Sequence, residues 1–172
     1  EDAVKNHNNW TIVRLTFILG IRPMPYVGRE NPLEQMIRLE RSQQVNDRRF
    51  SFLFARDAAE ALWEIAAAKP KGHIVHLGSE QSTTRYLIAV EMAEIMHLDA
   101  KIEAVTHDSL RGLAQRPVDT TWAFGAGRSR DLRQGLTDCA VDFVETHNFG
   151  LKGRAKEIAL FFGLNESTAL DR

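Results

Sequence analysis

Two adjacent arginines, Arg48 and Arg49, stand directly before the short apolar run FSFLF at residues 50–54. A third arginine, Arg116, directly precedes Pro117. Guanidinium groups bind phosphate oxygens through paired N–H donors, so arginines of this kind suit a diphosphate. The alternative is that Arg48 and Arg49 are solvated surface residues, and their spacing alone does not exclude it. An anion site beside this strand is nevertheless the leading candidate for chemistry in the sequence.

Two uncharged polar residues are further candidates. Asn31 precedes Pro32 and an amphipathic stretch, so its side chain can cap a helix or present its amide to a ligand at the start of that helix. Thr16 lies among apolar residues, and a buried hydroxyl needs a hydrogen-bond partner. Thr16 is therefore either bonded to the backbone in the core or placed at the edge of a cofactor. Both interpretations stay open for each residue.

Motifs for dinucleotides, metals and nucleophilic catalysis are weak in this sequence. The segment FGAGRSR contains a G-x-G, but Arg130 stands at the position of the third glycine of the dinucleotide fingerprint. His73 and His76 lie three apart in a strand pattern, so their rings should point to opposite faces. No G-x-S-x-G motif is present. We therefore expect no metal site and no catalytic residue in these 172 residues.

Composition indicates a globular protein with no broad electrostatic preference. Of the 172 residues, 44% are hydrophobic and 26% are charged, and the formal net charge is −1. A net charge this small gives no electrostatic reason to expect binding to nucleic acid or to an anionic membrane. No apolar run is long enough for a membrane span. Cys139 is the single cysteine, so no intrachain disulfide can form. We expect a cytoplasmic protein without nucleic-acid or membrane partners.

The elements that must position these residues alternate between strand and helix patterns, which indicates the α/β class. The run WTIVRLTFIL at 10–19 is typical of a strand buried on both faces of a parallel sheet. A helix with Asp57 in its first turn follows the strand at 50–54. Further strands are predicted at 73–78 and 100–105. Further helices are predicted at 31–42, from a cap at Ser82 or Thr83 to 97, at 106–115, at 131–147 and at 151–164.

The order of these segments resembles the C-terminal half of an extended short-chain dehydrogenase/reductase. The resemblance covers roughly residues 1–147 and is closest to sugar-nucleotide epimerases, dehydratases and 4-ketoreductases, including the dTDP-4-dehydrorhamnose reductase group. It rests on the order of the segments VRLTFILG, NPLEQMIRL, RRFSFLFARDAAEAL, HIVHLGSEQSTTRYLIAVEMAEIM, AQRPVDTTW and LRQGLTDCAVDFV. The tripeptide Gln-Arg-Pro at 115–117 is also similar to a non-catalytic relative, the regulatory β subunit of methionine adenosyltransferase.

The resemblance implies the edge of a Rossmann-type sheet plus a small mixed α/β subdomain that binds a nucleotide sugar. It implies NAD or NADP as the cofactor of the parent protein. Thr16 and Phe17 map to the turn near the nicotinamide. The implied substrate contacts are Asn31 for the nucleotide, and Arg49, less directly Arg48, and Arg116 for the diphosphate.

Departures from the family pattern indicate that the chain lacks activity by itself. The sequence contains neither the Gly-rich loop nor the Tyr-x-x-x-Lys pair, so the means of moving a hydride and a proton are missing. Phe17-Ile18 stands where the family often has Asn-Pro or Ser/Thr-Trp, and Phe54 where a histidine often follows. The alternative function is therefore a non-catalytic regulatory or interaction protein with the same fold.

The same resemblance suggests how the chain is organised. We expect a C-terminal substrate-binding portion at 1–147 and a helical extension at 148–172, with residues 1–8 as the end of a preceding helix. A parallel strand such as 10–19 needs neighbours at both edges and cover on both faces. We therefore expect a homodimer, or association with an N-terminal half of the fold.

Overall fold

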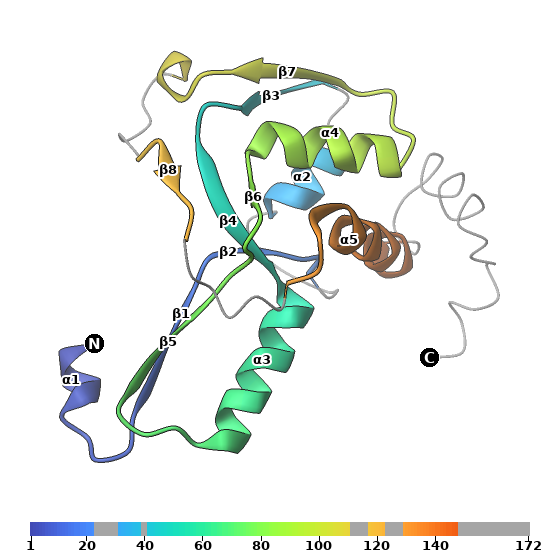
Figure 1. Cartoon of the computed structure of the whole chain (residues 1–172). Coiled ribbons are helices and arrows are strands. Elements are labelled where there is room, and N and C mark those ends of the chain that lie inside the picture. Colours follow the sequence, from blue (N-terminus) through green and yellow to red (C-terminus); the bar gives the residue numbers. More distant parts are fainter. Residues whose placement is uncertain (23–30, 39–40, 111–116, 123–128, 148–172) are drawn as a thin grey trace. The chain divides into compact units, whose positions relative to one another are not determined.

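The computed structural model describes residues 1–22, 31–38, 41–110, 117–122 and 129–147, and it has the α/β fold predicted from the sequence (Figure 1). The chain divides into two compact units, each built from three separate segments. Unit 1 comprises Glu1–Gly20, Asp47–Thr84 and Thr106–Asp131, and unit 2 comprises Ile21–Asn46, Arg85–Val105 and Leu132–Arg172.

The sheet strands of unit 1 differ in one respect from the expectation of a single strand at 10–19. This stretch forms β1 (Thr11–Leu15) and β2 (Phe17–Leu19), divided at Thr16. β1 pairs in parallel with β5 (His73–Leu77), whereas β2 pairs in parallel with β4 (Arg49–Phe54). The prediction of one continuous strand was wrong because its two halves have different partners, a choice made by residues far away in sequence.

Two short strands complete the sheet around β4. β6 (Ser82–Thr83) runs antiparallel to β4, and β8 (Asp119–Thr120) runs parallel to it. Ser82 and Thr83 were expected to cap a helix, and that expectation was wrong because their backbones pair with β4 instead. The extended conformation predicted around Asp119 is confirmed.

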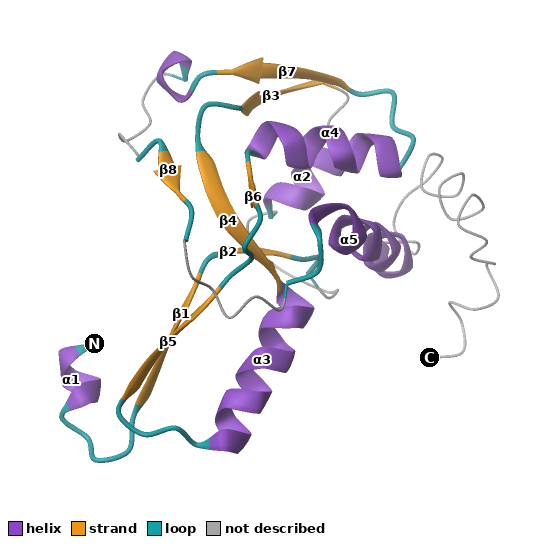
Figure 2. Ribbon diagram, in the orientation of Figure 1, coloured by secondary structure: helices purple, strands orange, loops and turns teal. Residues whose placement is uncertain are grey.

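Helix α3 (Ala55–Ala68) follows β4 directly and packs on the sheet of unit 1 (Figure 2). Asp57 lies in its first turn, as predicted, where a carboxylate complements the helix dipole. Asp57 is buried and accepts a hydrogen bond of 2.9 Å from the Arg130 backbone N–H. The unit 1 core consists of Leu53, Ala58, Ala61 and Leu77, with Val13, Ile65 and Val75 packed against it. The short helix α1 (Asp2–Lys5) lies at the N-terminus.

The apolar residues of β1, β2 and β5 are not all covered within this chain. Leu15, Phe17, Ile18 and Ile74 are 37–42% exposed. The expectation that residues 10–19 are buried on both faces is therefore not met by the residues that the structure describes. A run of apolar residues of this kind is typical of a strand that is covered on both faces, so these exposed side chains are candidates for contact with another polypeptide.

Unit 2 is a two-stranded parallel sheet with helices packed against it. β3 (Arg41–Val45) pairs with β7 (Lys101–Val105), and α4 (Arg85–Ile95) contacts both strands (Figure 1). α2 (Pro32–Arg38) and α5 (Leu132–His147) pack against α4. The strand predicted at 100–105 and the helix predicted at 131–147 are confirmed. The buried apolar residues of this unit include Leu33, Met36, Ile37, Ile88, Met92, Leu136, Ala140 and Phe143.

The segment predicted as a helix at 106–115 begins with only one helical turn. This turn is the 3-10 helix η1 (His107–Ser109), and Leu110 after it is extended. Thr106 occupies the N-cap position, but no side-chain cap hydrogen bond forms. Residues 111–116 and the helix predicted at 151–164 lie outside the described residues. Within the described ranges, no helix is both long and apolar enough to cross a membrane.

Candidate functional site

The candidate anion site lies at the start of β4, where Arg49 is the first residue of the strand and Arg48 directly precedes it. The Arg49 side chain is exposed, whereas the Arg48 side chain is only 16% exposed. The family resemblance implied a diphosphate contact at Arg49 and, less directly, at Arg48, and the two side chains differ in their exposure.

Arg49 presents its guanidinium to solvent beside two other elements of unit 1. Its Nη2 donates a 2.7 Å hydrogen bond to Ser82 Oγ on β6. Its backbone N–H donates to the Val118 carbonyl, 2.9 Å away, which joins β4 to the strand β8. Asp119 is the residue opposite Arg49 in this pairing. The cation is therefore fixed at one edge and still accessible to a ligand.

Asp119 shows the electrostatic effect of this arrangement. Hydrogen bonds from the backbone and side chain of Thr121 lower the pKa of the Asp119 carboxyl, and the charge of Arg49 lowers it further. Asp119 is thus ionised at neutral pH and partly balances Arg49. An anionic ligand at this position has to compete with Asp119 for the guanidinium.

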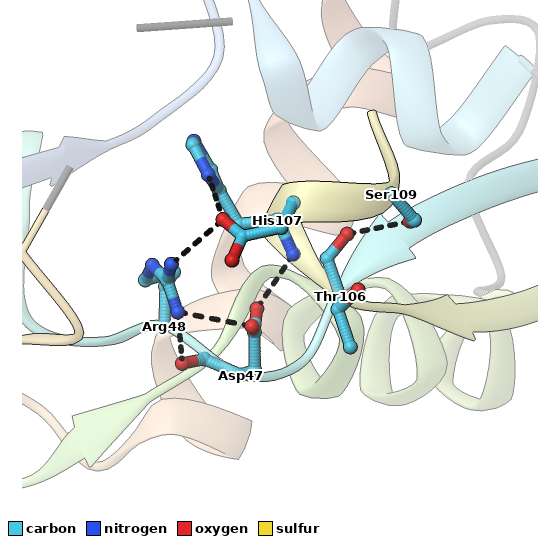
Figure 3. Close-up of polar contacts among 6 residues, drawn as sticks. Asp47, Arg48, Thr106, His107 and Ser109 are labelled. Carbon is cyan, nitrogen blue, oxygen red and sulfur yellow. Dashed lines mark hydrogen bonds and ion pairs between the residues drawn. The ribbon is translucent and has the colours of Figure 1, made fainter. Parts of the chain in front are cut away.

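Arg48 is committed to two carboxylates of the same unit (Figure 3). Its Nη1 lies 2.9 Å from Asp47 Oδ2, and its Nη2 lies 3.2 Å from Asp108 Oδ1. Asp47 also accepts a 2.8 Å hydrogen bond from the His107 backbone N–H. The sequence indicated none of these partners, because Arg48 and Asp108 are 60 positions apart.

Thr16 and Phe17 lie at the junction of β1 and β2. The Thr16 hydroxyl is buried and has no hydrogen-bond partner, and a Cβ added at Gly78 would lie 2.6 Å from Thr16 Cγ2. The Phe17 ring lies 4.9 Å from the ring of Phe50, the residue after Arg49. The structure therefore brings Phe17 next to the strand that carries Arg49.

These residues fit a dinucleotide cofactor only at one point. The unpartnered Thr16 hydroxyl is a polar group suited to a cofactor edge, but the space at Gly78 is filled by the Thr16 methyl group. The described residues offer no glycine-rich cradle for a pyrophosphate, which such a cofactor requires. The described part of the chain is therefore insufficient to hold NAD or NADP, and no reaction step is assigned to it.

Asn31 caps helix α2 in unit 2. Its Oδ1 accepts a 3.0 Å hydrogen bond from the Glu34 backbone N–H, which confirms the capping interpretation. Glu34 is buried and paired with Arg22, whose backbone N–H also donates to Glu34 Oε1 at 3.1 Å. Sequence reasoning missed this pair, although the spacing Asn-x-x-Glu is the signature of a capping box. Contact of Asn31 with a nucleotide stays a prediction.

Burial of the Glu34 carboxyl raises its pKa, but the hydrogen bonds and charge of Arg22, together with the Asn31 backbone, outweigh that effect. The net result is a lowered pKa. Arg116, the remaining candidate for a diphosphate contact, lies outside the described residues.

Comparisons with known proteins identify the family and the fold of the chain. The family model for the RmlD substrate binding domain matches residues 1–126. No curated protein sequence matches the chain. Solved structures with the same fold include the dTDP-4-dehydrorhamnose reductase of Bacillus anthracis in complex with NADP, which is 18% identical with a TM-score of 0.65. This match covers 79% of the present chain and 49% of that reductase.

Two further solved structures support the same fold. The Clostridium acetobutylicum dTDP-4-dehydrorhamnose reductase is 19% identical with a TM-score of 0.62, over 78% of this chain and 49% of that one. The Thermotoga maritima UDP-glucose 4-epimerase with UDP-glucose is 18% identical with a TM-score of 0.60, over 79% and 46%. The present chain thus spans about half the length of these neighbours. By its sequence match and its fold, the chain belongs to the family of RmlD substrate binding domains.

Proposed function

We propose that this chain is the nucleotide-sugar-binding portion of an NAD(P)-dependent sugar-nucleotide reductase, epimerase or dehydratase. The observation that carries the proposal is Arg49, whose exposed guanidinium donates to Ser82 Oγ and whose backbone N–H donates to the Val118 carbonyl next to β8. A guanidinium fixed in this way suits the diphosphate of a nucleotide sugar. The family membership supports the same ligand, because solved neighbours include a UDP-glucose 4-epimerase with UDP-glucose.

The other proposed contacts have different kinds of support. Arg116 is proposed as the second diphosphate arginine from the family resemblance alone, and Asn31 as a nucleotide contact at the start of α2. Thr16 and Phe17 are proposed to face the nicotinamide of the parent protein, beside the strand of Arg49. Residues 1–147 are proposed as the substrate-binding portion, with 148–172 as an extension.

The direct test is calorimetric binding of the nucleoside diphosphates UDP and dTDP to the chain. We expect Arg49→Ala to weaken binding by roughly 10- to 100-fold, because a hydrogen bond to a charged group contributes about 1.5–3 kcal/mol. Arg49→Lys should lie between wild type and Ala, since lysine keeps the charge but lacks the fork. Arg14→Ala is the matched control, because Arg14 is also an exposed strand arginine of unit 1 with a side-chain partner, Glu1.

Two results would contradict the proposal: no nucleotide binding by the folded wild type, or equal affinity in Arg49→Ala. Catalysis is tested separately by NAD(P)H oxidation with nucleotide-4-keto sugars. We expect none from this chain, and robust turnover would overturn the expectation that it is inactive on its own.

A second function, that of a regulatory or interaction protein, is favoured by a specific observation. Phe17 and Ile18 are 37% and 42% exposed at the point where the family resemblance places a cofactor. Exposed apolar residues that adjoin one another often mark a protein contact. A folded chain that binds no nucleoside diphosphate but forms a stable complex dependent on Ile18 would favour this function over the first.

A further inference from the structure

Arg48 and Arg49 are neighbours in sequence, but the contacts of Arg48 give it a different role. We propose that Arg48, together with Asp47 and Asp108, forms a strut that fixes the start of β4 and so positions the Arg49 guanidinium. In this view Arg48 is a positioning residue and does not contact the diphosphate. The consequence for ligand binding rests on the proposed function of Arg49, whereas the strut itself does not.

The strut joins two segments of unit 1 that are far apart in the sequence. The His107 N–H donates to Asp47, and Arg48 pairs with Asp108; each contact joins residues 60 positions apart. The segments around Asp47 and His107 are therefore held side by side by these side-chain bonds.

The Arg48 guanidinium faces into this junction (Figure 3). Both of its Nη groups contact carboxylates, and its Nε is buried. The turn that carries Asp108 is itself closed by the Ser109 hydroxyl, which donates to the Thr106 carbonyl at 2.6 Å. To reach a ligand, Arg48 would have to leave two charge-assisted hydrogen bonds, which are the strong kind.

The strut acts on Arg49 through the backbone. Arg49 follows Arg48 directly, and its N–H donates to the Val118 carbonyl at 2.9 Å. The Thr120 hydroxyl donates to the Arg49 carbonyl at 3.3 Å. The start of β4 is thus held by Asp108 just before Arg49 and by the β8 segment at Arg49. If the first attachment is lost, Arg49 loses part of the support that aligns its side chain with Ser82.

The effect of Asp108→Asn on UDP affinity distinguishes a positioning role of Arg48 from a ligand-binding role. If Arg48 is a strut, the variant should bind UDP about two- to fivefold more weakly, given the modest strength of a pair with one exposed partner. If Arg48 is a ligand, releasing it from Asp108 should leave the affinity unchanged or increase it. Arg48→Met removes the pairs with both Asp47 and Asp108, so it should weaken binding at least as much as Asp108→Asn. The double variant Arg48→Met/Asp108→Asn should match Arg48→Met, because the Asp108 pair is already lost in the single variant.

Backbone amide exchange tests the strut without any ligand. The His107 and Arg49 amides should exchange about two- to fivefold faster in Asp108→Asn and Arg48→Met than in wild type. Arg49→Ala, which leaves the strut intact, should not change the His107 amide. Asp108 is 67% exposed, so its substitution should not prevent folding.

The outcomes of the two measurements are distinct. Faster exchange with weaker UDP binding supports the inference, whereas unchanged amides, or equal or tighter UDP binding in Asp108→Asn, overturn it. If the wild type binds no UDP, the proposed function fails, and the amide exchange alone then decides whether Arg48 is a strut.

Discussion

Adjacent polar residues in this protein differ in their roles because their side chains have different partners. Arg48 points inward to Asp47 and Asp108, whereas Arg49 is exposed beside Ser82. Asn31 also has a structural role, because its side-chain oxygen accepts a hydrogen bond from the Glu34 backbone N–H at the start of α2. A polar residue near a proposed site therefore has to be tested for its structural role before a ligand role is assigned.

The Glu34 carboxylate should make stability depend on pH, and Glu34→Gln tests this effect. The folded-state pKa of Glu34 is lowered, so its contribution is present above the unfolded-state pKa and is lost as pH falls through the folded-state pKa. At pH 7 we expect Glu34→Gln to reduce the free energy of unfolding by about 2 kcal/mol, because Arg22 loses a charged partner. The measurement is urea denaturation between pH 7 and acidic pH.

The difference between wild type and Glu34→Gln should shrink as the pH falls below about 4. Glu60→Gln, at an exposed position of α3, serves as the control and should change stability little. A difference that stays constant with pH would show that the Glu34 charge is not what stabilises the start of α2.

At the scale of elements, the junction of β1 and β2 decides how unit 1 is built. β1 pairs with β5 up to Leu15, and β2 pairs with β4 from Phe17 onward. Between the two strands, the Thr16 N–H still donates to the Leu77 carbonyl at 3.1 Å. Gly78 follows β5 and lies against the Thr16 side chain. Because glycine has no Cβ, the backbone at Gly78 can approach Thr16 closely where the chain passes from β1 to β2.

Gly78→Ala should therefore destabilise the protein. The new Cβ would lie 2.6 Å from Thr16 Cγ2, so the strand or the side chain has to shift. Overpacking of this kind typically costs about 1–3 kcal/mol of unfolding free energy. Adding Thr16→Ser removes the methyl group and should recover most of the loss, with Thr16→Ser alone as the control. Chemical denaturation gives all four values, and a Gly78→Ala protein as stable as wild type would disprove the packing argument.

At the scale of the whole molecule, unit 1 leaves apolar side chains of its strands exposed. Leu15, Phe17, Ile18 and Ile74 are each more than a third exposed. Burying apolar surface is favourable by about 25 cal/mol per Å², so exposed apolar side chains favour association. The chain also spans about half the length of its solved neighbours. From these observations we expect association through the exposed side chains of β1, β2 and β5.

We expect the isolated chain to self-associate, and Ile18→Lys to weaken that association by at least about tenfold. A lysine at this position places a charge among the exposed apolar side chains of β2. Leu87→Lys is the matched control in unit 2, because Leu87 is 41% exposed and Ile18 is 42% exposed. Sedimentation equilibrium measures the dissociation constant of each variant. A monomeric wild type, or equal loss in the control, would rule out a contact through Ile18.

The sequence by itself determined the features that depend on nearby residues. The α/β class, the strands near 73–78 and 100–105 and the helix at 131–147 follow from side-chain periodicity, which acts over a few residues. The cap at Asn31 and the acidic first turn at Asp57 are also local. The ordered segments together predicted the family, to which the match over residues 1–126 assigns the chain.

Only the tertiary structure decided which residues meet across the chain. The break at Thr16, the pairing of Ser82 with β4 and the contact of Arg48 with Asp108 depend on partners many positions away. Two adjacent arginines look alike in a sequence, because their local environment is the same. They differ in the folded unit because Arg48 pairs with Asp47 and Asp108 whereas Arg49 bonds to Ser82, and these partners determine which cation is used internally and which remains exposed.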